Sequence, residues 1–287
     1  MLAHPLAGPA SGAGRFDRVG IQVSYWWRHG RVPDVDDPRL FTEWVQHRKL
    51  YDRDPRMPAL ADKVAVKAWV TGQLGPGWVI PTLWHGTALP GDAVWPRPFV
   101  VKARHGCNQS RFVFDETTDW LRVRRDSARW MKGRYGGWLS EWLYRDVPRG
   151  LLVEPFVGHG RMLPIDYKFF VFGGRVEYVQ VHLGRGQRHR WILLDRRWRR
   201  LSGRTDEPDP VRPDSLTRMI AAAETLGQGF TFVRVDMYDG ALGPLFGEMT
   251  FYPGSGLDRF NPVSLDARMG LYWRIALARR SEAKLAA

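Results

Sequence analysis

Residues 232–262, FVRVDMYDGALGPLFGEMTFYPGSGLDRFNP, constrain the fold of this chain more than any other stretch. Apolar and polar residues alternate in FVRVDMY, which is the period-two pattern of a β-strand. The Asp-Gly pair at 239–240 favours a turn, and the segment after it predicts a second strand that carries Glu248. The sequence therefore predicts a hairpin that brings Asp236 of the first arm close to Glu248 of the second.

Asp236 and Glu248 would repel each other unless a cation lay between them. Mg²⁺ binds proteins through a few carboxylates and completes its shell with phosphate oxygens and water. Arg234 shares the strand face of Asp236, where a guanidinium is well placed to grip a phosphate or a carboxylate. A surface hairpin with solvated charges is the alternative. The segment FYPGSG after the second carboxylate favours close approach of a ligand instead.

Composition limits the class of protein and its partners. The chain has 287 residues, enough for one large domain or two or three small ones, and 44% of them are hydrophobic, which is typical of a packed globular protein. A formal net charge of +13 favours acidic partners: nucleotides, anionic polymers, nucleic acid or acidic membranes. The basic residues are scattered, so nucleic-acid binding is disfavoured, and the oligomeric state stays open.

Cys107 is the single cysteine, so the sequence excludes an intramolecular disulfide and a cysteine zinc cluster. The N-terminus lacks the basic region and the long apolar core of a signal peptide, and no run approaches the ~18 apolar residues of a membrane span. We therefore expect a cytoplasmic protein with no membrane span.

Two lysines stand at positions where they could meet a phosphate. Lys67 lies in a helix predicted over 62–72, four residues after Lys63, and a solvated basic face is the alternative. Lys102 ends a short strand that runs into the small, polar loop 103–110. Backbone N–H groups of such a loop can cradle phosphates, although the spacing of a Walker A motif is absent.

A second hairpin is predicted over 164–183, with Gly-Gly at 173–174 as its turn. Asp166 and Lys168 share one face of its first strand. The basic loop that follows could bind an acidic substrate or be solvated. A strand over 150–157 contains Pro155, which cannot donate to a ladder, so we expect an edge strand or a linker there.

Helical segments are predicted around these strands. One of them ends in a basic turn at 46–49 and is interpreted as a packing helix. The predicted helical segments lie within 19–50 and at 62–72, 127–132, 139–144, 215–226 and 266–287.

The order of these segments resembles the ATP-grasp superfamily, and most of all its TupA-like branch, named for a teichuronopeptide biosynthesis protein. The similarity is carried, in this order, by ADKVAVKAWV, FVVKARHG, VEPFV, LPIDYKFFVFGG, FVRVDMY and FGEMTFYPGSGLDRFNP. The resemblance implies an α+β chain with the ATP-grasp fold, in which two α+β subdomains hold the nucleotide between them. The implied divisions are an N-terminal tail and helical region at 1–50, a linker subdomain at 51–98, a small lid subdomain at 99–157 and a C-terminal subdomain with the metal site at 158–287.

The resemblance also implies roles for single residues, with ATP and Mg²⁺ as cofactors. The implied catalytic residues are Arg234 and Lys168. The implied metal ligands are Asp236, Glu248 and Thr250. The implied cofactor-binding residues are Lys67, Lys102, His105, Gly106, Glu154, Phe156 and Val157. The implied substrate-binding residues are Arg185, Arg188, Ser255 and Gly256.

Three features depart from the pattern of the family. Thr250 stands where many ATP-grasp enzymes have asparagine, and its hydroxyl can still ligate Mg²⁺. The loop HGCNQS is poorer in glycine and serine than the family pattern. The segment GHGRML after Glu154 offers no acidic residue for a ribose.

The implied reaction is ATP-dependent ligation of a carboxylate to an amine, through an acyl phosphate, in cell-surface polymer or secondary-metabolite biosynthesis. Such chemistry needs positioning and charge more than covalent work by side chains. The partners would be small-molecule or polymer-linked acids and amines. One alternative is a kinase of a sugar or polysaccharide hydroxyl. The other is a non-catalytic binder of an anionic polymer or nucleic acid, with steep salt dependence.

Overall fold

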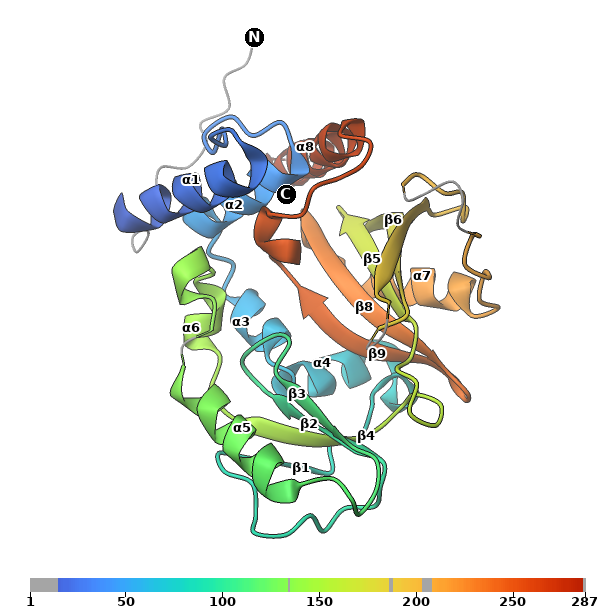
Figure 1. Cartoon of the computed structure of the whole chain (residues 1–287). Helices are drawn as coiled ribbons and strands as arrows, with labels where there is room; N and C mark the ends of the chain where they lie inside the picture. Colours follow the sequence, from blue (N-terminus) through green and yellow to red (C-terminus); the bar gives the residue numbers. More distant parts are fainter. Residues whose placement is uncertain (1–14, 134, 186–187, 203–207, 286–287) are drawn as a thin grey trace.

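The structure, a computed structural model of the chain, describes residues 15–133, 135–185, 188–202 and 208–285 (Figure 1). Two antiparallel sheets form its framework, one with the strand order β1-β4-β2-β3 and the other with the order β7-β6-β5-β8-β9. The strands of the small sheet are β1 Trp84–Gly86, β2 Phe99–Ala103, β3 Ser110–Val113 and β4 Leu151–Pro155. Those of the large sheet are β5 Asp166–Phe172, β6 Arg175–Leu183, β7 Arg190–Asp195, β8 Phe232–Gly240 and β9 Gly243–Thr250.

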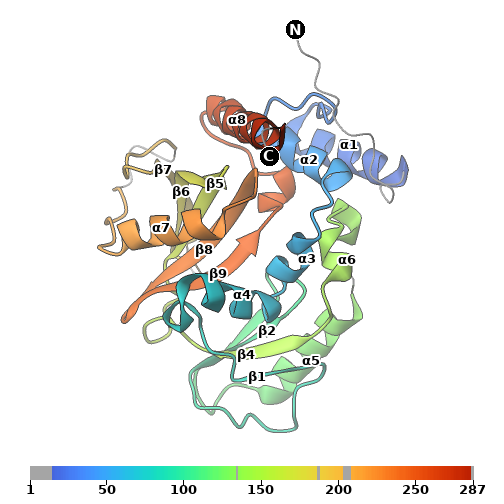
Figure 2. The same ribbon diagram turned by 180° about the vertical axis from the view of Figure 1, so that it is seen from behind.

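Helices surround the two sheets. At one end of the molecule α1, α2 and α8 lie together, as both Figure 1 and Figure 2 show. Helix α7 packs on β5, β6 and β8, and α5 packs on β2. The helices are α1 Arg15–His29, α2 Phe41–Tyr51, α3 Arg56–Ala61, α4 Ala65–Leu74, α5 Trp120–Lys132, α6 Leu143–Asp146, α7 Leu216–Leu226 and α8 Ser264–Leu285. Short 3₁₀ turns occur at η1 Pro76–Trp78, η2 Gly137–Leu139 and η3 Pro253–Gly256.

The main core is built on the large sheet. Its centre is a group of aromatic rings from four elements: Phe41 of α2, Phe172 of β5, Phe232 of β8 and Trp273 of α8. The Phe232 ring lies 4.5 Å from Trp273 and 4.9 Å from Phe172, within the range of favourable aromatic contacts. The contacts between these rings therefore hold α2 and α8 against the large sheet. The small sheet has a separate core of its own, formed with α5.

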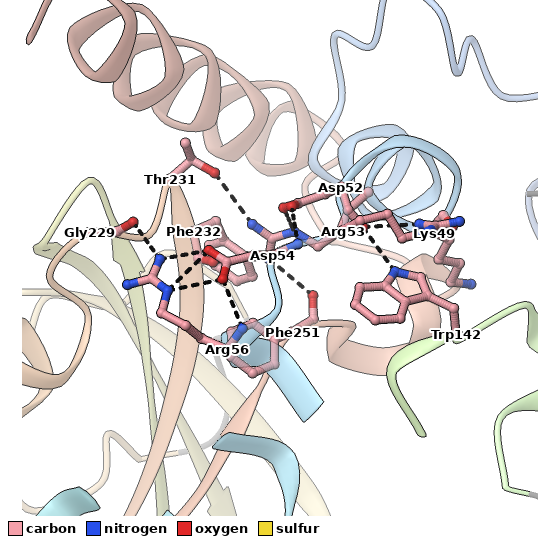
Figure 3. A network of polar contacts seen from close by, with 11 residues as sticks. Lys49, Asp52, Arg53, Asp54, Arg56, Trp142, Gly229, Thr231, Phe232 and Phe251 are labelled. Carbon is pink, nitrogen blue, oxygen red and sulfur yellow. Dashed lines mark hydrogen bonds and ion pairs between the residues drawn. The ribbon is translucent and has the colours of Figure 1, made fainter. Parts of the chain in front are cut away.

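A buried guanidinium also joins α2 to the large sheet, and four of the residues that accept from it, Asp52, Thr231, Phe232 and Phe251, are labelled in Figure 3. Arg48 is 2% exposed and donates to the carbonyl oxygens of Phe232 at 2.9 Å and Phe251 at 3.3 Å. Its remaining donors reach Thr231 Oγ1 at 3.3 Å and Asp52 at 3.1 Å. Because a buried charge needs partners for its donors, the basic turn that ends α2 acts as an internal clamp.

The segment after α2 extends the same network (Figure 3). Arg56 pairs with Asp54 and donates to the carbonyl oxygen of Gly229 at 3.0 Å. Trp142, just before α6, donates its indole N–H to the carbonyl oxygen of Asp52 at 2.9 Å. These contacts fix α2, α6 and the entry to β8 against one another.

Both predicted hairpins are present, but the turn predicted at 239–240 is wrong: Asp239 and Gly240 belong to β8 and pair with Pro244 and Gly243, so the turn lies at residues 241–242. Asp236 pairs directly with Glu248 across β8 and β9, and the glycines at 173–174 connect β5 to β6. The expectation of an edge strand or linker at 150–157 is wrong, because β4 pairs with β1 on one side and β2 on the other. Pro155 is tolerated since it is the last residue of β4, where only the final ladder donor is lost.

Several helix boundaries differ from the predictions. The helix predicted over 62–72 is α4, which begins at Ala65, continues to Leu74 and ends at Gly75 with φ 93°. Asp62 Oδ1 accepts from the N–H groups of Val64 and Ala65 at its start. Helix α5 begins at Trp120, well before 127.

Among the described residues, no helix combines the length and the apolar character that crossing a bilayer requires.

Candidate functional site

A cavity of about 780 Å³ lies between the two sheets. On the side of the small sheet its lining is largely apolar: Val100 of β2, Phe112 of β3, Ile80 before β1, and Phe156 and Val157 after β4. On the other side, near η2, α6 and η3, the lining carries polar groups: Tyr135, Glu141, Tyr144, Ser255 and Asp258. The charged side chains of the lining include Asp166 and Lys168 of β5, Arg234 and Asp236 of β8 and Glu248 of β9. A cavity with an apolar side and convergent polar groups has the usual character of a ligand site.

Asp236 is the centre of a charged cluster on the large sheet, with a side chain that is 2% exposed. Arg234 holds it in a bidentate pair, Nε to Oδ1 and Nη2 to Oδ2, both at 2.7 Å. Lys168, its direct neighbour on β5, also pairs with Oδ2, and its Nζ lies 2.8 Å from Asp166 Oδ2. The order of β5 beside β8 therefore brings two cations onto one buried carboxylate.

Glu248 faces this cluster with looser contacts. Its Oε1 lies 3.6 Å from Arg234 Nη2, and its Oε2 lies 3.5 Å from Lys63 Nζ. Thr250 Oγ1 accepts from Arg234 Nη2 at 3.1 Å and lies 3.4 Å from Glu248 Oε1. The Glu248 side chain is 29% exposed, so it is more open to a ligand than Asp236.

The cluster is charged at neutral pH. Burial and Arg234 oppose the charge on Lys168, but Asp236 and Asp166 outweigh them and raise the pKa of Lys168. Burial likewise opposes ionisation of Glu248, yet Lys63 and the other cations of the cluster hold its pKa below the ordinary value. The site thus presents fixed positive and negative groups side by side.

The oxygen donors fit a magnesium ion that also binds a ligand. Asp236, Glu248 and Thr250 offer carboxylate and hydroxyl oxygens, the donor type that Mg²⁺ prefers. Within the described ranges, no group of three or more His, Cys, Asp or Glu side chains could enclose a metal by itself. The rest of the coordination shell would therefore come from phosphate oxygens and water, as is usual for this ion.

Glu154 joins two lysines beside the cavity. Its side chain is 6% exposed, and its Oε2 lies 2.6 Å from Lys102 Nζ while Oε1 pairs with Lys67. Burial opposes its ionisation, but Lys102 and Lys67 outweigh burial and lower the pKa of Glu154. Lys67 also donates to Ile80 O at 2.8 Å and Thr82 Oγ1 at 2.7 Å, so its three N–H groups are engaged.

The structure places most of the predicted residues at the cavity. Those that line it are Lys102, Gly106, Phe156, Val157, Lys168, Arg185, Arg234, Asp236, Glu248, Thr250 and Ser255. Those that are not among the lining residues are Lys67, His105, Glu154, Arg188 and Gly256. The roles implied for both groups of residues stay predictions.

His105 has a structural place. Its Nδ1 accepts from the N–H of Gly150 at 3.3 Å, which leaves Nε2 to donate to the carbonyl oxygen of Trp130 at 3.3 Å. Burial lowers its pKa, so the ring is neutral at pH 7. These bonds hold the loop after β2 against α5 and β4.

A family model described as TupA-like ATPgrasp matches residues 43–274, most of the chain. The chain belongs to the TupA-like ATP-grasp family. The resemblance found in the sequence is thereby confirmed, and so is the ATP-grasp fold class with its two antiparallel sheets and helices. A search of the curated proteins found no match.

Solved ATP-grasp structures are similar to this ATP-grasp chain at low identity. The D-alanine–D-alanine ligase from Bacillus anthracis, complexed with ATP, is 15% identical over 78% of this chain and 67% of its own, with a TM-score of 0.47. The D-cycloserine synthetase DcsG is 19% identical over 79% and 72%, with a TM-score of 0.46. The VanG D-Ala:D-Ser ligase from Enterococcus faecalis is 13% identical over 77% and 62%, with a TM-score of 0.48. Membership of the family therefore rests on the family model.

Lys63 is a site residue that the sequence did not single out for this cavity of the ATP-grasp fold. It precedes α4, lines the cavity and donates to Gly106 O at 2.7 Å while facing Glu248. The sequence signal that could have identified Lys63 was its spacing of four residues from Lys67, but a phosphate-binding role was predicted only for Lys67. Since α4 begins at Ala65, the two ammonium groups do not share a helical face.

Two buried polar atoms point to a polar ligand in the cavity. Asp166 Oδ1 and His182 Nε2 are buried with no hydrogen-bond partner among the residues that the structure describes, and both residues line the cavity on neighbouring strands. Burial and Lys168 lower the pKa of His182 to about 3, so its ring is neutral at pH 7, and its Nδ1 lies 2.9 Å from His189 Nε2. Buried polar atoms are normally satisfied, which makes these two candidates for ligand contacts.

Ser255 is held at the cavity by a buried lysine. Lys49 Nζ donates to Ser255 Oγ at 2.7 Å, Ser255 O at 2.9 Å and Gln46 Oε1 at 3.0 Å. The turn is left-handed over three residues, with φ 51° at Gly254, 56° at Ser255 and 67° at Gly256. A non-glycine residue with positive φ needs such support, so α2 fixes the position of this lining loop.

Proposed function

We propose that this ATP-grasp chain is an ATP-dependent ligase that joins a carboxylate to an amine through an acyl phosphate. The observation that carries the proposal is the pairing of Asp236 with Glu248 at the cavity, beside Arg234 and Lys168. Facing carboxylates next to fixed cations suit transfer of a phosphoryl group, which depends on positioning and charge. The expected role in cell-surface polymer or secondary-metabolite biosynthesis, and the cytoplasmic location, stay predictions.

The lining of the cavity supports an orientation for ATP. The apolar side, with Val100, Phe112 and Phe156, suits the adenine ring. Lys102 shares a strand face with Val100 on β2, and Lys63 Nζ lies 3.5 Å from Glu248 Oε2, so the two ammonium groups would meet the phosphates. The loop 106–110, which also lines the cavity, offers backbone N–H groups to the same phosphates.

Asp236 and Glu248 would hold Mg²⁺, with Thr250 as a further oxygen donor. When bound, the ion would neutralise negative charge on the phosphates. Arg234 and Lys168 are fixed by Asp236 and so need little reorganisation to stabilise charge on the transferred group. Arg234 and Lys168 would thus be held in position for the first step, the transfer of the phosphoryl group to the acid.

In that step an oxygen of the acid forms a bond to the γ-phosphorus, and the bond from this phosphorus to the ADP oxygen breaks. The amine then attacks the acyl carbon, phosphate leaves, and the nitrogen loses a proton. The polar side of the cavity, with Glu141, Ser255 and Asp258, is available to bind the acid and the amine. We predict that the acid and the amine are small molecules or groups attached to a polymer.

The first experiment is a thermal shift assay with Mg²⁺ and a non-hydrolysable ATP analogue. At 100 times its dissociation constant, the analogue should stabilise the protein by about 2.7 kcal/mol. Asp236→Asn with Glu248→Gln should abolish the metal-dependent part of the shift. Glu116→Gln, at a side chain that is 86% exposed, is the matched control and should behave as wild type.

The outcome separates the proposal from its alternatives. Screening of acids with amines should give phosphate release and an amide product, whereas a kinase would give a stable phosphoester. No shift at millimolar nucleotide, combined with salt-sensitive binding of polyanions, would overturn the ligase in favour of an anionic-polymer binder.

A further inference from the structure

Helix α1 carries a row of large apolar side chains that the described chain leaves uncovered. The exposed fractions are 91% for Phe16, 51% for Val19, 59% for Val23, 57% for Trp26 and 78% for Trp27. Their spacing of three, four, three and one residues places them on one face of a helix. Single exposed apolar residues are common, but a continuous apolar row on one helix face indicates an interaction surface.

The opposite face of α1 already performs the packing. Ile21 and Tyr25 are buried, and the Tyr25 hydroxyl lies 2.9 Å from Thr42 Oγ1 on α2. At the end of the helix, Arg28 Nε donates to the carbonyl oxygen of Leu257 at 2.9 Å. The helix is therefore anchored without its apolar row, which faces away from the core.

Basic side chains share this end of the molecule. Helix α8 lies beside α2 and close to α1 in both Figure 1 and Figure 2. Its exposed side chains include Arg268, Arg274, Arg279 and Arg280. Together with the net charge of +13, they make a negatively charged surface the complementary partner.

We propose that α1 docks this protein on the surface of an anionic lipid bilayer. Phe16, Val19, Val23, Trp26 and Trp27 enter the interfacial region, and the exposed arginines at this end of the molecule add positive charge near the lipid headgroups. Tryptophan and phenylalanine beside arginine are the side chains that suit this interface. Fifteen residues span about 22 Å, so α1 lies in the plane of the membrane surface and does not cross the bilayer.

Charge favours a membrane over a second copy of the chain. Two copies, each with a net charge of +13, repel each other, whereas anionic headgroups attract both the arginines and the whole molecule. The docking surface is also next to the cavity, because α1 contacts η2 and the His29 ring lies 3.4 Å from Gly256 O. The proposal does not depend on the ligase activity.

The test is sedimentation of the full chain with vesicles. Vesicles of phosphatidylglycerol mixed with phosphatidylcholine should bind wild type, and phosphatidylcholine alone should bind it much more weakly. The double variant Trp26→Ser with Trp27→Ser should lose on the order of tenfold or more in partitioning, because two aromatic rings are removed from the interface. Added salt should weaken the binding of wild type.

A matched control removes exposed apolar side chains elsewhere. Val211, 89% exposed, and Leu242, fully exposed in the β8–β9 turn, lie outside α1 and α8, and Val211→Ser with Leu242→Ser should bind as wild type. Thermal unfolding should show that both double variants fold, since the changed side chains are exposed.

Three results would overturn the proposal. The first is no binding of wild type to anionic vesicles, and the second is equal binding of wild type and the Trp26/Trp27 variant. The third is a concentration-dependent dimer that only this variant loses, in a protein that ignores vesicles, which would assign the apolar row to a second copy. Failure to bind nucleotide in the separate thermal shift assay would leave the membrane result unaffected.

Discussion

Replacement of Arg48 by methionine should destabilise the protein strongly. Methionine keeps an apolar stem against the Trp273 ring, which the guanidinium now covers at 4.4 Å, but it removes every donor. The carbonyl oxygens of Phe232 and Phe251 would lose their bonds to a charged group inside the core. A bond to a charged group contributes about 1.5 kcal/mol or more, so the two losses amount to about 3 kcal/mol.

The pair with Asp52 adds less, because that carboxylate is 32% exposed and would regain water. We therefore expect the free energy of unfolding to fall by about 3–4 kcal/mol, within the range seen for broken buried ion pairs. Chemical denaturation followed by tryptophan fluorescence should show a lower midpoint with an unchanged m-value. Arg39→Met is the control, since its guanidinium is 78% exposed, and it should cost less than about 0.5 kcal/mol.

A cost below about 1 kcal/mol for Arg48→Met would refute the reasoning. It would mean that water or a rearranged side chain satisfies the buried carbonyl groups. Arg48→Lys should lie between wild type and the methionine variant, because one ammonium cannot reproduce the planar fork that reaches α2 and β8 together.

The remaining predictions concern the site. Glu154→Gln should lower the free energy of unfolding by about 3 kcal/mol at pH 7. Because the pKa of Glu154 is lowered in the folded protein, the stabilisation from its ion pairs is present above about pH 4.3 and is lost as the pH falls through the folded pKa. The denaturation midpoints of the variant and wild type should therefore converge in acid. A variant that stays equally destabilised at low pH would contradict this. Gly256→Ala should lower the free energy of unfolding by about 1–3 kcal/mol, because φ is 67° and a Cβ would meet Gln46 Nε2 at 2.5 Å. Thermal unfolding should show this loss, with Gly77→Ala as the control, since a Cβ there meets nothing within 4 Å. Lys63→Met should weaken binding of the ATP analogue about tenfold, measured by calorimetry, and unchanged affinity would argue against a phosphate contact.

Local patterns fixed the elements that carry the candidate site. The alternation in residues 232–238 was enough to predict the arm that carries Asp236, and the strand expected after it carries Glu248. The pairing of the two carboxylates depends on a turn at residues 241–242, not at the Asp-Gly pair, and on a β-bulge between Asp236 and Met237. Similarly, Asp166 and Lys168 were assigned to one strand face, and their side chains pair at 2.8 Å. The order of six short motifs was enough for the family.

Long-range contacts were beyond such patterns. The sequence predicted an edge strand or linker at β4, yet β1 and β2 enclose it, because a proline restricts a strand less at its final residue. The sequence also did not predict that Glu154 is buried between Lys67 and Lys102 from two other elements. It also left the basic end of α2 as a packing helix and did not predict that Arg48 clamps β8.

The sequence by itself determined the strands, the hairpin of carboxylates and the family, since these depend on neighbours along the chain. Only the tertiary structure decided which cations meet which carboxylates, because the strand order places β5 beside β8 and the segment before α4 brings Lys63 Nζ to 3.5 Å from Glu248 Oε2. It also decided which apolar residues stay outside the core: α1 has two faces, and α2 covers only the one with Ile21 and Tyr25. Periodicity defines the faces of an element, but the packing of distant elements selects the face that is buried.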